Sequence, residues 1–128
     1  MTVVLDSWAI MRLLDGAEPA ASRVQAVIDS GEAAMSWINL GEVLYILRRS
    51  VGVESAERTV RDVEGVVRVS LPDRSLVMDA AAIKSNFAMS YADAFAAATA
   101  VQLDAALWTG DSELLIAGAP WHPFDPSA

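Results

Sequence analysis

The chain contains no cysteine, and this absence excludes two kinds of site. Without thiols there can be neither a disulfide framework nor a thiolate zinc site. Histidine is nearly absent as well, because His122 is the only one, and the proline that follows it indicates a structural or exposed residue. Any metal site must therefore be built from oxygen ligands. The lack of disulfides also favours a cytoplasmic protein.

Positive charge is scarce too. Nine Lys and Arg residues stand against 17 Asp and Glu, which gives a net charge of −8 and a pI near 4.4. This balance argues against simple electrostatic binding of nucleic acid, which normally depends on clustered basic residues. Hydrophobic residues make up 54% of the chain and charged residues only 20%, too apolar for a disordered segment. The surplus apolar surface predicts an oligomer or a subunit of a complex.

No long uninterrupted hydrophobic run is present. Asp6 and Arg12 interrupt the apolar N-terminus and no basic segment precedes it, which argues against a signal peptide. The alanine-rich stretch 87–103 contains Asp93, so a buried soluble helix is a better interpretation than a membrane span. The length of 128 residues is that of one ordinary domain. We therefore expect a single domain over residues 1–128 and no association with a membrane.

The hydrophobic pattern predicts short strands that alternate with helices. We expect strands at 3–5, 33–35, 66–69 and 106–108, and an edge strand at 121–124. Helices are expected after residues 6–7, from Pro19 to 30, from Ser36 to 49, and over 54–64, 76–83, 90–104 and 111–116. This order predicts an α/β fold with three layers, in which helices cover both faces of a central, mostly parallel sheet.

Four acidic residues lie in apolar or small-residue surroundings where a carboxylate is out of place. Right-handed crossovers put ligands beyond the carboxyl ends of parallel strands. Asp6 directly follows the first strand, Glu42 lies on the helix entered from the second, and Asp111 follows the fourth. These three are expected at one crevice, and Asp93, near the start of a helix, could join them.

Helix capping is the competing explanation for three of these acids. Asp6 and Asp111 could each be an N-cap, and Ser90 with Asp93 has the S-x-x-D form of a capping box. Capping does not explain Glu42, which lies well inside its helix with no basic neighbour on the same face.

Four converging carboxylates would repel one another unless a cation neutralised them. Mg²⁺ or Mn²⁺ would keep them ionised, and two such ions about 3.5–4 Å apart can activate water and stabilise the attacking and leaving oxygens of a phosphodiester. Ser7 and Thr109 lie beside these acids and could orient a carboxylate, or could be local turn hydroxyls.

Four short motifs, in this order and spacing, resemble those of the PIN-domain ribonucleases, and within them the VapC-type toxins of toxin–antitoxin modules. The resemblance covers nearly the whole chain and rests on Val4-Leu5-Asp6-Ser7, Asn39-Leu40-Gly41-Glu42-Val43, Ser90-Tyr91-Ala92-Asp93-Ala94 leading into 97–100, and Leu107-Trp108-Thr109-Gly110-Asp111. It implies a three-layer α/β/α PIN fold and an endoribonuclease that depends on Mg²⁺ or Mn²⁺. It also implies a homodimer inhibited by a small cognate antitoxin of the VapB type.

The resemblance also implies roles for individual residues. Asp6, Glu42, Asp93 and Asp111 would form the acidic quartet and bind the metal, with Thr109 as the accompanying hydroxyl residue. Glu113 would be an additional acidic neighbour, and Ser7 stands where many relatives have threonine.

The basic residues expected on the flanking helices are candidates for contacts with RNA phosphates, with surface solubility as the alternative: Arg12, Arg48, Arg49 and Lys84. Trp8, Trp37 and Trp108 could stack on bases but are more typical of packing residues.

The main alternative function is a non-catalytic α/β protein-interaction module whose acids are helix caps. A haloacid-dehalogenase-like phosphatase is disfavoured because it needs a D-x-D motif after the first strand, where this chain has Asp6-Ser7-Trp8. A receiver domain is disfavoured because the only lysine lies in an expected helix.

Overall fold

A computed structural model describes residues 1–128. Its centre is a five-stranded sheet in the order β3-β2-β1-β4-β5, with every neighbouring pair parallel. The α/β fold with a mostly parallel sheet is therefore confirmed, and the edge strand β5 is parallel as well. The strands are short: β1 Val3–Leu5, β2 Ala33–Ser36, β3 Arg68–Ser70, β4 Ala106–Trp108 and β5 Pro123–Phe124.

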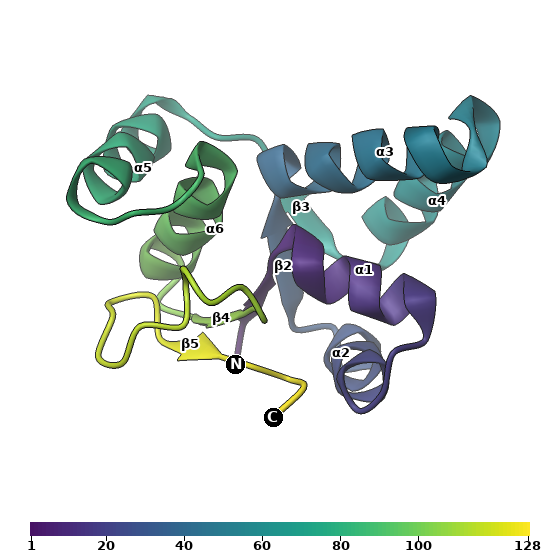
Figure 1. Ribbon diagram of the computed structural model, residues 1–128, viewed down its shortest axis with the longest axis horizontal. Helices are drawn as coiled ribbons and strands as arrows, with labels where there is room; N and C mark the ends of the chain where they lie inside the picture. The colour runs from purple at the N-terminus through teal and green to yellow at the C-terminus, as the bar shows by residue number, and fades with distance from the viewer.

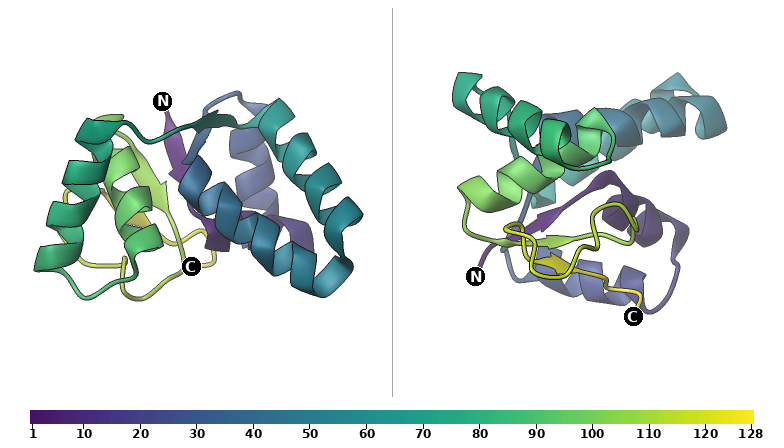
Figure 2. Two further views of the ribbon diagram at one scale, coloured as in Figure 1. Left: turned by 90° about the horizontal axis from the view of Figure 1, so that it is seen from above. Right: turned by 60° about the vertical axis from the view of Figure 1, so that its left-hand side comes forward.

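Six helices connect these strands and form two layers (Figure 1). The helices are α1 Ser7–Asp15, α2 Ala20–Asp29, α3 Trp37–Val51, α4 Val53–Val66, α5 Arg74–Asn86 and α6 Tyr91–Gln102. Figure 2 shows α5 and α6 as one pair on one side of the strands, with the α3–α4 hairpin on the other. Four of the N-caps use side chains that the sequence makes available, because Asp6, Ser36, Asp73 and Ser90 each accept a backbone N–H of the following turn.

Side chains of the sheet alternate between two apolar cores, as the pleat of a strand requires. Val3 and Leu5 point into the core shared with α1 to α4, and Val4, between them, packs with α5 and α6. Leu107 lies in the second core beside Trp121, which is fully buried. Both faces of the sheet are therefore covered, as is usual for a parallel sheet.

Helix α6 is buried on nearly all sides. Every residue from Asp93 to Ala100 is at most 8% exposed, and five of these eight are alanines. A methyl side chain lets the helix axis approach the sheet, α3 and α5 closely. No helix of the chain is both long enough and apolar enough to span a membrane.

Two expected elements differ from the structure. Residues 111–116 do not form a helix but a series of turns, because six residues give too few hydrogen bonds to offset helix nucleation. The indole nitrogen of Trp121 instead donates to the carbonyl of Leu114 at 2.9 Å and holds this segment. The third strand begins at Arg68 rather than Val66, because α4 continues through Val66 and Val67 caps it.

The order of the strands creates a point at which the winding of the chain reverses. From β1 the chain adds β2 and β3 on one side, and it then returns to place β4 and β5 on the other. Neighbouring strands β1 and β4 therefore send their following segments to opposite faces. Ligands of open α/β sheets bind at this switch point, beyond the carboxyl ends of the strands.

Candidate metal centre

Asp6 directly follows the last residue of β1, at the switch point. It is the N-cap of α1, its carboxylate accepts the N–H of Ala9 at 2.9 Å, and only 1% of the residue is exposed. Burial raises the pKa of the Asp6 carboxyl from its usual 3.8 to about 7, and the charges of Asp111 and Glu42 contribute to the rise. Hydrogen bonds from Thr109 and Ala9 oppose it. Asp6 is thus a helix cap and a member of a crowded acidic group at once.

Asp111 follows the neighbouring strand β4 after Thr109 and Gly110. The buried hydroxyl oxygen of Thr109 accepts the N–H of Asp111 at 3.0 Å, and the carboxylate of Asp111 accepts the N–H of Glu113 at 3.0 Å. These bonds shape a turn that presents both acids on the same side. Capping of a helix by Asp111 does not occur, because no helix follows.

Gly110 makes this approach to α1 possible. A Cβ atom at this position would lie 2.1 Å from the ring of Trp8, which no real contact allows. Glycine is thus required for the turn to lie against the indole. The same indole carries the Arg12 guanidinium at 5.1 Å from its ring centroid.

Asp93 lies in the first turn of α6. The hydroxyl oxygen of Ser90 accepts its backbone N–H at 3.1 Å, but the structure contains no return bond from Asp93 to the N–H of Ser90, so only half of the capping box forms. The residue is 8% exposed, and burial together with neighbouring Asp111 raises the pKa of the Asp93 carboxyl from 3.8 to about 7. Carboxylate oxygens of Asp93, Asp111 and Glu113 all lie within 4.8 Å of one another.

Glu42 approaches from α3 and is half-buried. The charge of Glu42 contributes to the raised pKa of both Asp6 and Asp93, which indicates that Glu42 faces the same cluster of acids. Its carboxylate accepts the amide N–H of Asn39 at 3.1 Å. The residue patterns do not predict this role for Asn39; its position one turn before Glu42 in a buried helix was the available signal.

The combined geometry is that of an acidic cluster without a counter-charge. The structure contains two ion pairs, Met1 with Glu32 and Arg48 with Glu57, and neither involves a cluster residue. An all-carboxylate donor set fits a hard divalent cation such as Mg²⁺ or Mn²⁺. The set consists of Asp93, Asp111 and Glu113, with Asp6 and Glu42 beside them.

The other expected residues are dispersed. Ser7 is the half-buried first residue of α1. Arg48 is paired with Glu57 at 3.7 Å, Arg49 stacks on Tyr45, and Lys84 donates to the carbonyl of Met89 at 2.8 Å.

Arg12 has no acidic partner and remains available above Trp8. His122 is exposed with a φ of 44°.

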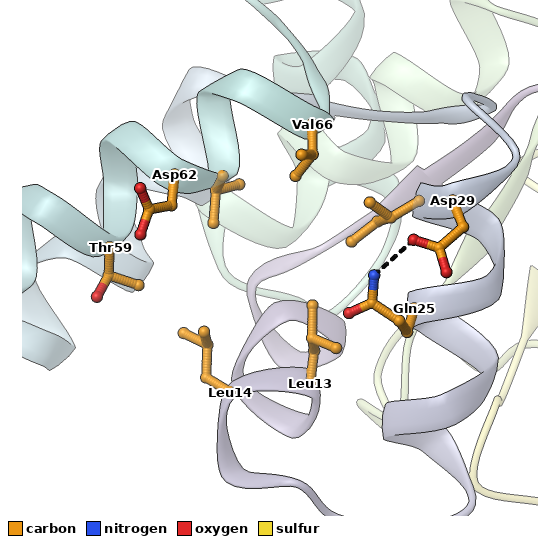
Figure 3. A pocket seen from close by; sticks show the side chains of 9 residues that line it. Leu13, Leu14, Gln25, Asp29, Thr59, Asp62 and Val66 are labelled. Atoms are coloured by element: carbon orange, nitrogen blue, oxygen red, sulfur yellow. Dashed lines mark hydrogen bonds between the residues drawn. The ribbon is translucent and has the colours of Figure 1, made fainter.

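The largest cavity of the molecule, about 630 Å³, lies away from the acids (Figure 3). It is a groove between α1, α2 and α4 with a mainly apolar lining. Asp62 and Asp29 lie among its walls, and Asp29 accepts a hydrogen bond from Gln25 at 2.8 Å. The lining residues are Leu13, Leu14, Gln25, Ile28, Asp29, Thr59, Asp62, Val63 and Val66.

Comparisons with known proteins identify the family and the fold. A family model described as the PIN domain matches residues 3–119. No curated protein matches by sequence.

Several solved structures are similar in fold. A toxin–antitoxin complex from Klebsiella pneumoniae is 18% identical, with 98% of each chain covered and a TM-score of 0.78. A DNA-bound VapBC from Salmonella typhimurium is 17% identical, again with 98% of each covered and a TM-score of 0.79. VapC20 of Mycobacterium tuberculosis, a toxin that cleaves the sarcin-ricin loop, is 19% identical; 92% of this chain and 96% of that one are covered, with a TM-score of 0.74.

Proposed function

The chain belongs to the PIN-domain family, and from this premise we propose that it is a metal-dependent endoribonuclease, the toxin of a type II toxin–antitoxin module. The observation that carries the proposal is the convergence of buried carboxylates at the switch point. Burial and neighbouring carboxyl groups raise the pKa of Asp6 and of Asp93 to about 7, and a divalent cation would counteract this destabilisation of their charged forms. Structural neighbours that are VapC toxins support the same activity.

Asp93 and Asp111 would hold Mg²⁺ or Mn²⁺, together with Glu113, Asp6 and Glu42. Such ions, when bound, supply Lewis acidity for attack of water on a phosphodiester. The protein's own contribution is to hold the carboxylates in place: Thr109 and Ala9 fix Asp6, and Glu113 N–H fixes Asp111. Arg12, preorganised on Trp8, would bind a substrate phosphate.

Purified protein should cleave RNA with Mn²⁺, and Glu42→Gln or Asp6→Asn should abolish cleavage without loss of folding. An Asp73→Asn variant is the matched control, since Asp73 is also an N-cap that accepts a backbone N–H at 2.9 Å, but on exposed α5. Cleavage by both acid variants at the level of the control would refute the assigned site.

The alternative function is a protein-interaction module in which the acids act as caps, and one observation favours it, since Asp6 does cap α1. Titration calorimetry with Mn²⁺ separates the two. Binding that Asp111→Asn weakens supports the nuclease, because Asp111 caps no helix; absence of binding supports the module.

We propose a cognate antitoxin as the partner, because related structures were solved as toxin–antitoxin complexes. Its chemistry should match the groove between α1, α2 and α4: an amphipathic segment with apolar residues for the lining and a basic residue for Asp29 or Asp62 (Figure 3). Leu14→Arg should prevent co-purification of the product of the neighbouring gene while RNA cleavage persists. A complex that survives this change would place the partner elsewhere.

A single domain over residues 1–128, a homodimer and a cytoplasmic location remain part of the proposal. Exposed apolar side chains on α5, such as Val77 and Met78, support self-association. Light scattering after gel filtration would measure the oligomeric state.

A further inference from the structure

Asn39 is a fully buried polar residue on α3, one turn before Glu42. Its amide nitrogen donates two hydrogen bonds, one to the Glu42 carboxylate at 3.1 Å and one to the Ala92 carbonyl at 3.1 Å. Its carbonyl oxygen has no partner, and it is the one buried side-chain polar atom in that state. A buried acceptor without a partner costs stability. Stability alone therefore does not explain an asparagine here.

The two hydrogen bonds also fix which way the amide points. Both neighbouring groups, the carboxylate and the backbone carbonyl, are acceptors, so only the NH₂ side of the amide can face them. The unpaired oxygen is the consequence. The side chain satisfies its two neighbours at the expense of its own acceptor.

These two neighbours belong to the two helices that bring acids to the cluster. Glu42 is the acid of α3, and Ala92 immediately precedes Asp93, the acid of α6. A donor shared between them limits the movement of the Glu42 carboxylate relative to the first turn of α6. A hydrogen bond to a charged acceptor is among the stronger ones, particularly where water is excluded.

We propose that Asn39 is a positioning residue, which fixes the Glu42 carboxylate against the first turn of α6 and thereby sets the affinity of the acidic cluster for Mg²⁺ or Mn²⁺. This inference rests on the proposed metal-dependent function. Loss of a group that orients a metal ligand typically lowers metal affinity about 10–100-fold. Asn39 acts through Glu42, so its effect should depend on the presence of Glu42.

The test is a double-mutant cycle on Mn²⁺ affinity, measured by calorimetry on the full chain without RNA. Asn39→Leu should weaken Mn²⁺ binding about tenfold in the wild-type background. In the Glu42→Ala background the same change should have less than about a twofold effect, because the coupled partner is gone. Thr99→Val is the matched control, since Thr99 is also buried and donates within α6 to the Phe95 carbonyl at 2.7 Å; it should leave Mn²⁺ affinity unchanged.

The outcomes are distinguishable. A wild-type chain that binds no Mn²⁺ overturns the metal site itself, and the inference with it. Wild-type binding with Asn39→Leu unchanged, or an equal loss in both backgrounds, or an equal loss in Thr99→Val, overturns the role of Asn39 alone. Thermal unfolding in EDTA checks that each variant folds. If Asn39→Leu does not fold, the same cycle with Asn39→Ala, which adds no new atoms, decides the matter.

Discussion

Replacing Asp6 with asparagine should make the metal-free protein more stable at neutral pH. Asparagine keeps the oxygen that accepts the Ala9 N–H, so the cap of α1 is preserved while the buried charge is removed. In the native protein the Asp6 pKa is raised from 3.8 to about 7, so the folded state holds a proton that the unfolded chain has already lost. The free energy of unfolding of the wild type must then fall as pH rises between these two values.

The pKa rise of Asp6 sets a ceiling on this loss. A change from 3.8 to about 7 corresponds to about 4 kcal/mol of unfolding free energy once Asp6 is fully ionised. Because Asp6 also contributes to the raised pKa of Asp93, the two carboxyl groups titrate together, and we expect about half of this penalty, roughly 2 kcal/mol, from Asp6→Asn. The extra unfolding free energy of Asp6→Asn over the wild type should be near zero at pH 4, appear between pH 4 and 7, and stay constant above pH 7.

Urea unfolding in EDTA, followed by tryptophan fluorescence at several pH values, measures this difference. Asp73→Asn, the same substitution at the exposed N-cap of α5, is the matched control and should not stabilise the protein at neutral pH, because it removes no buried charge. Saturating Mn²⁺ should reverse the order and stabilise the wild type more than Asp6→Asn, because the cation binds the ionised carboxylate. Identical pH dependence of wild type and Asp6→Asn would refute the argument that crowded, desolvated carboxylates destabilise the metal-free fold.

Three further predictions concern neighbouring residues. Gly110→Ala should cost about 1–3 kcal/mol and lower RNA cleavage, because its Cβ displaces Trp8; Gly65→Ala, in open space on α4, should instead stabilise by about 0.5–1 kcal/mol in the same urea assay. Glu113→Gln should weaken Mn²⁺ binding less than Asp111→Asn in calorimetry, because Glu113 is exposed; an equal loss would make Glu113 a full ligand. Arg12→Ala should reduce the salt dependence of RNA binding by about one unit of slope, whereas Arg48→Ala, already paired with Glu57, should not.

The sequence predicts the strands and the positions of the acids because both depend on local pattern. Val3–Leu5 is apolar and begins with two β-branched residues, and an acid directly after such a strand must lie at the carboxyl end of the sheet. The half-formed capping box of Ser90 shows where local reasoning is incomplete, because the Asp93 carboxyl turns to Asp111, which is 18 residues away.

The role of Asn39 and the turns at 111–116 depend on packing between distant segments, which no local pattern contains. Asn39 meets Ala92 only because α3 and α6 pack together. Leu114 is held by Trp121 instead of by a helix.

The alanine surface of α6 makes the acidic cluster sensitive to changes at residues that carry no carboxylate. Ala96, Ala97 and Ala100 are completely buried, so one added methyl group would push the helix away from its neighbours and move Asp93 with it. A genetic selection for variants that have lost the proposed nuclease activity should therefore return substitutions at these alanines beside those at the carboxylates. Such variants would retain every acidic side chain of the cluster, but these side chains would no longer lie close enough together to form the metal site.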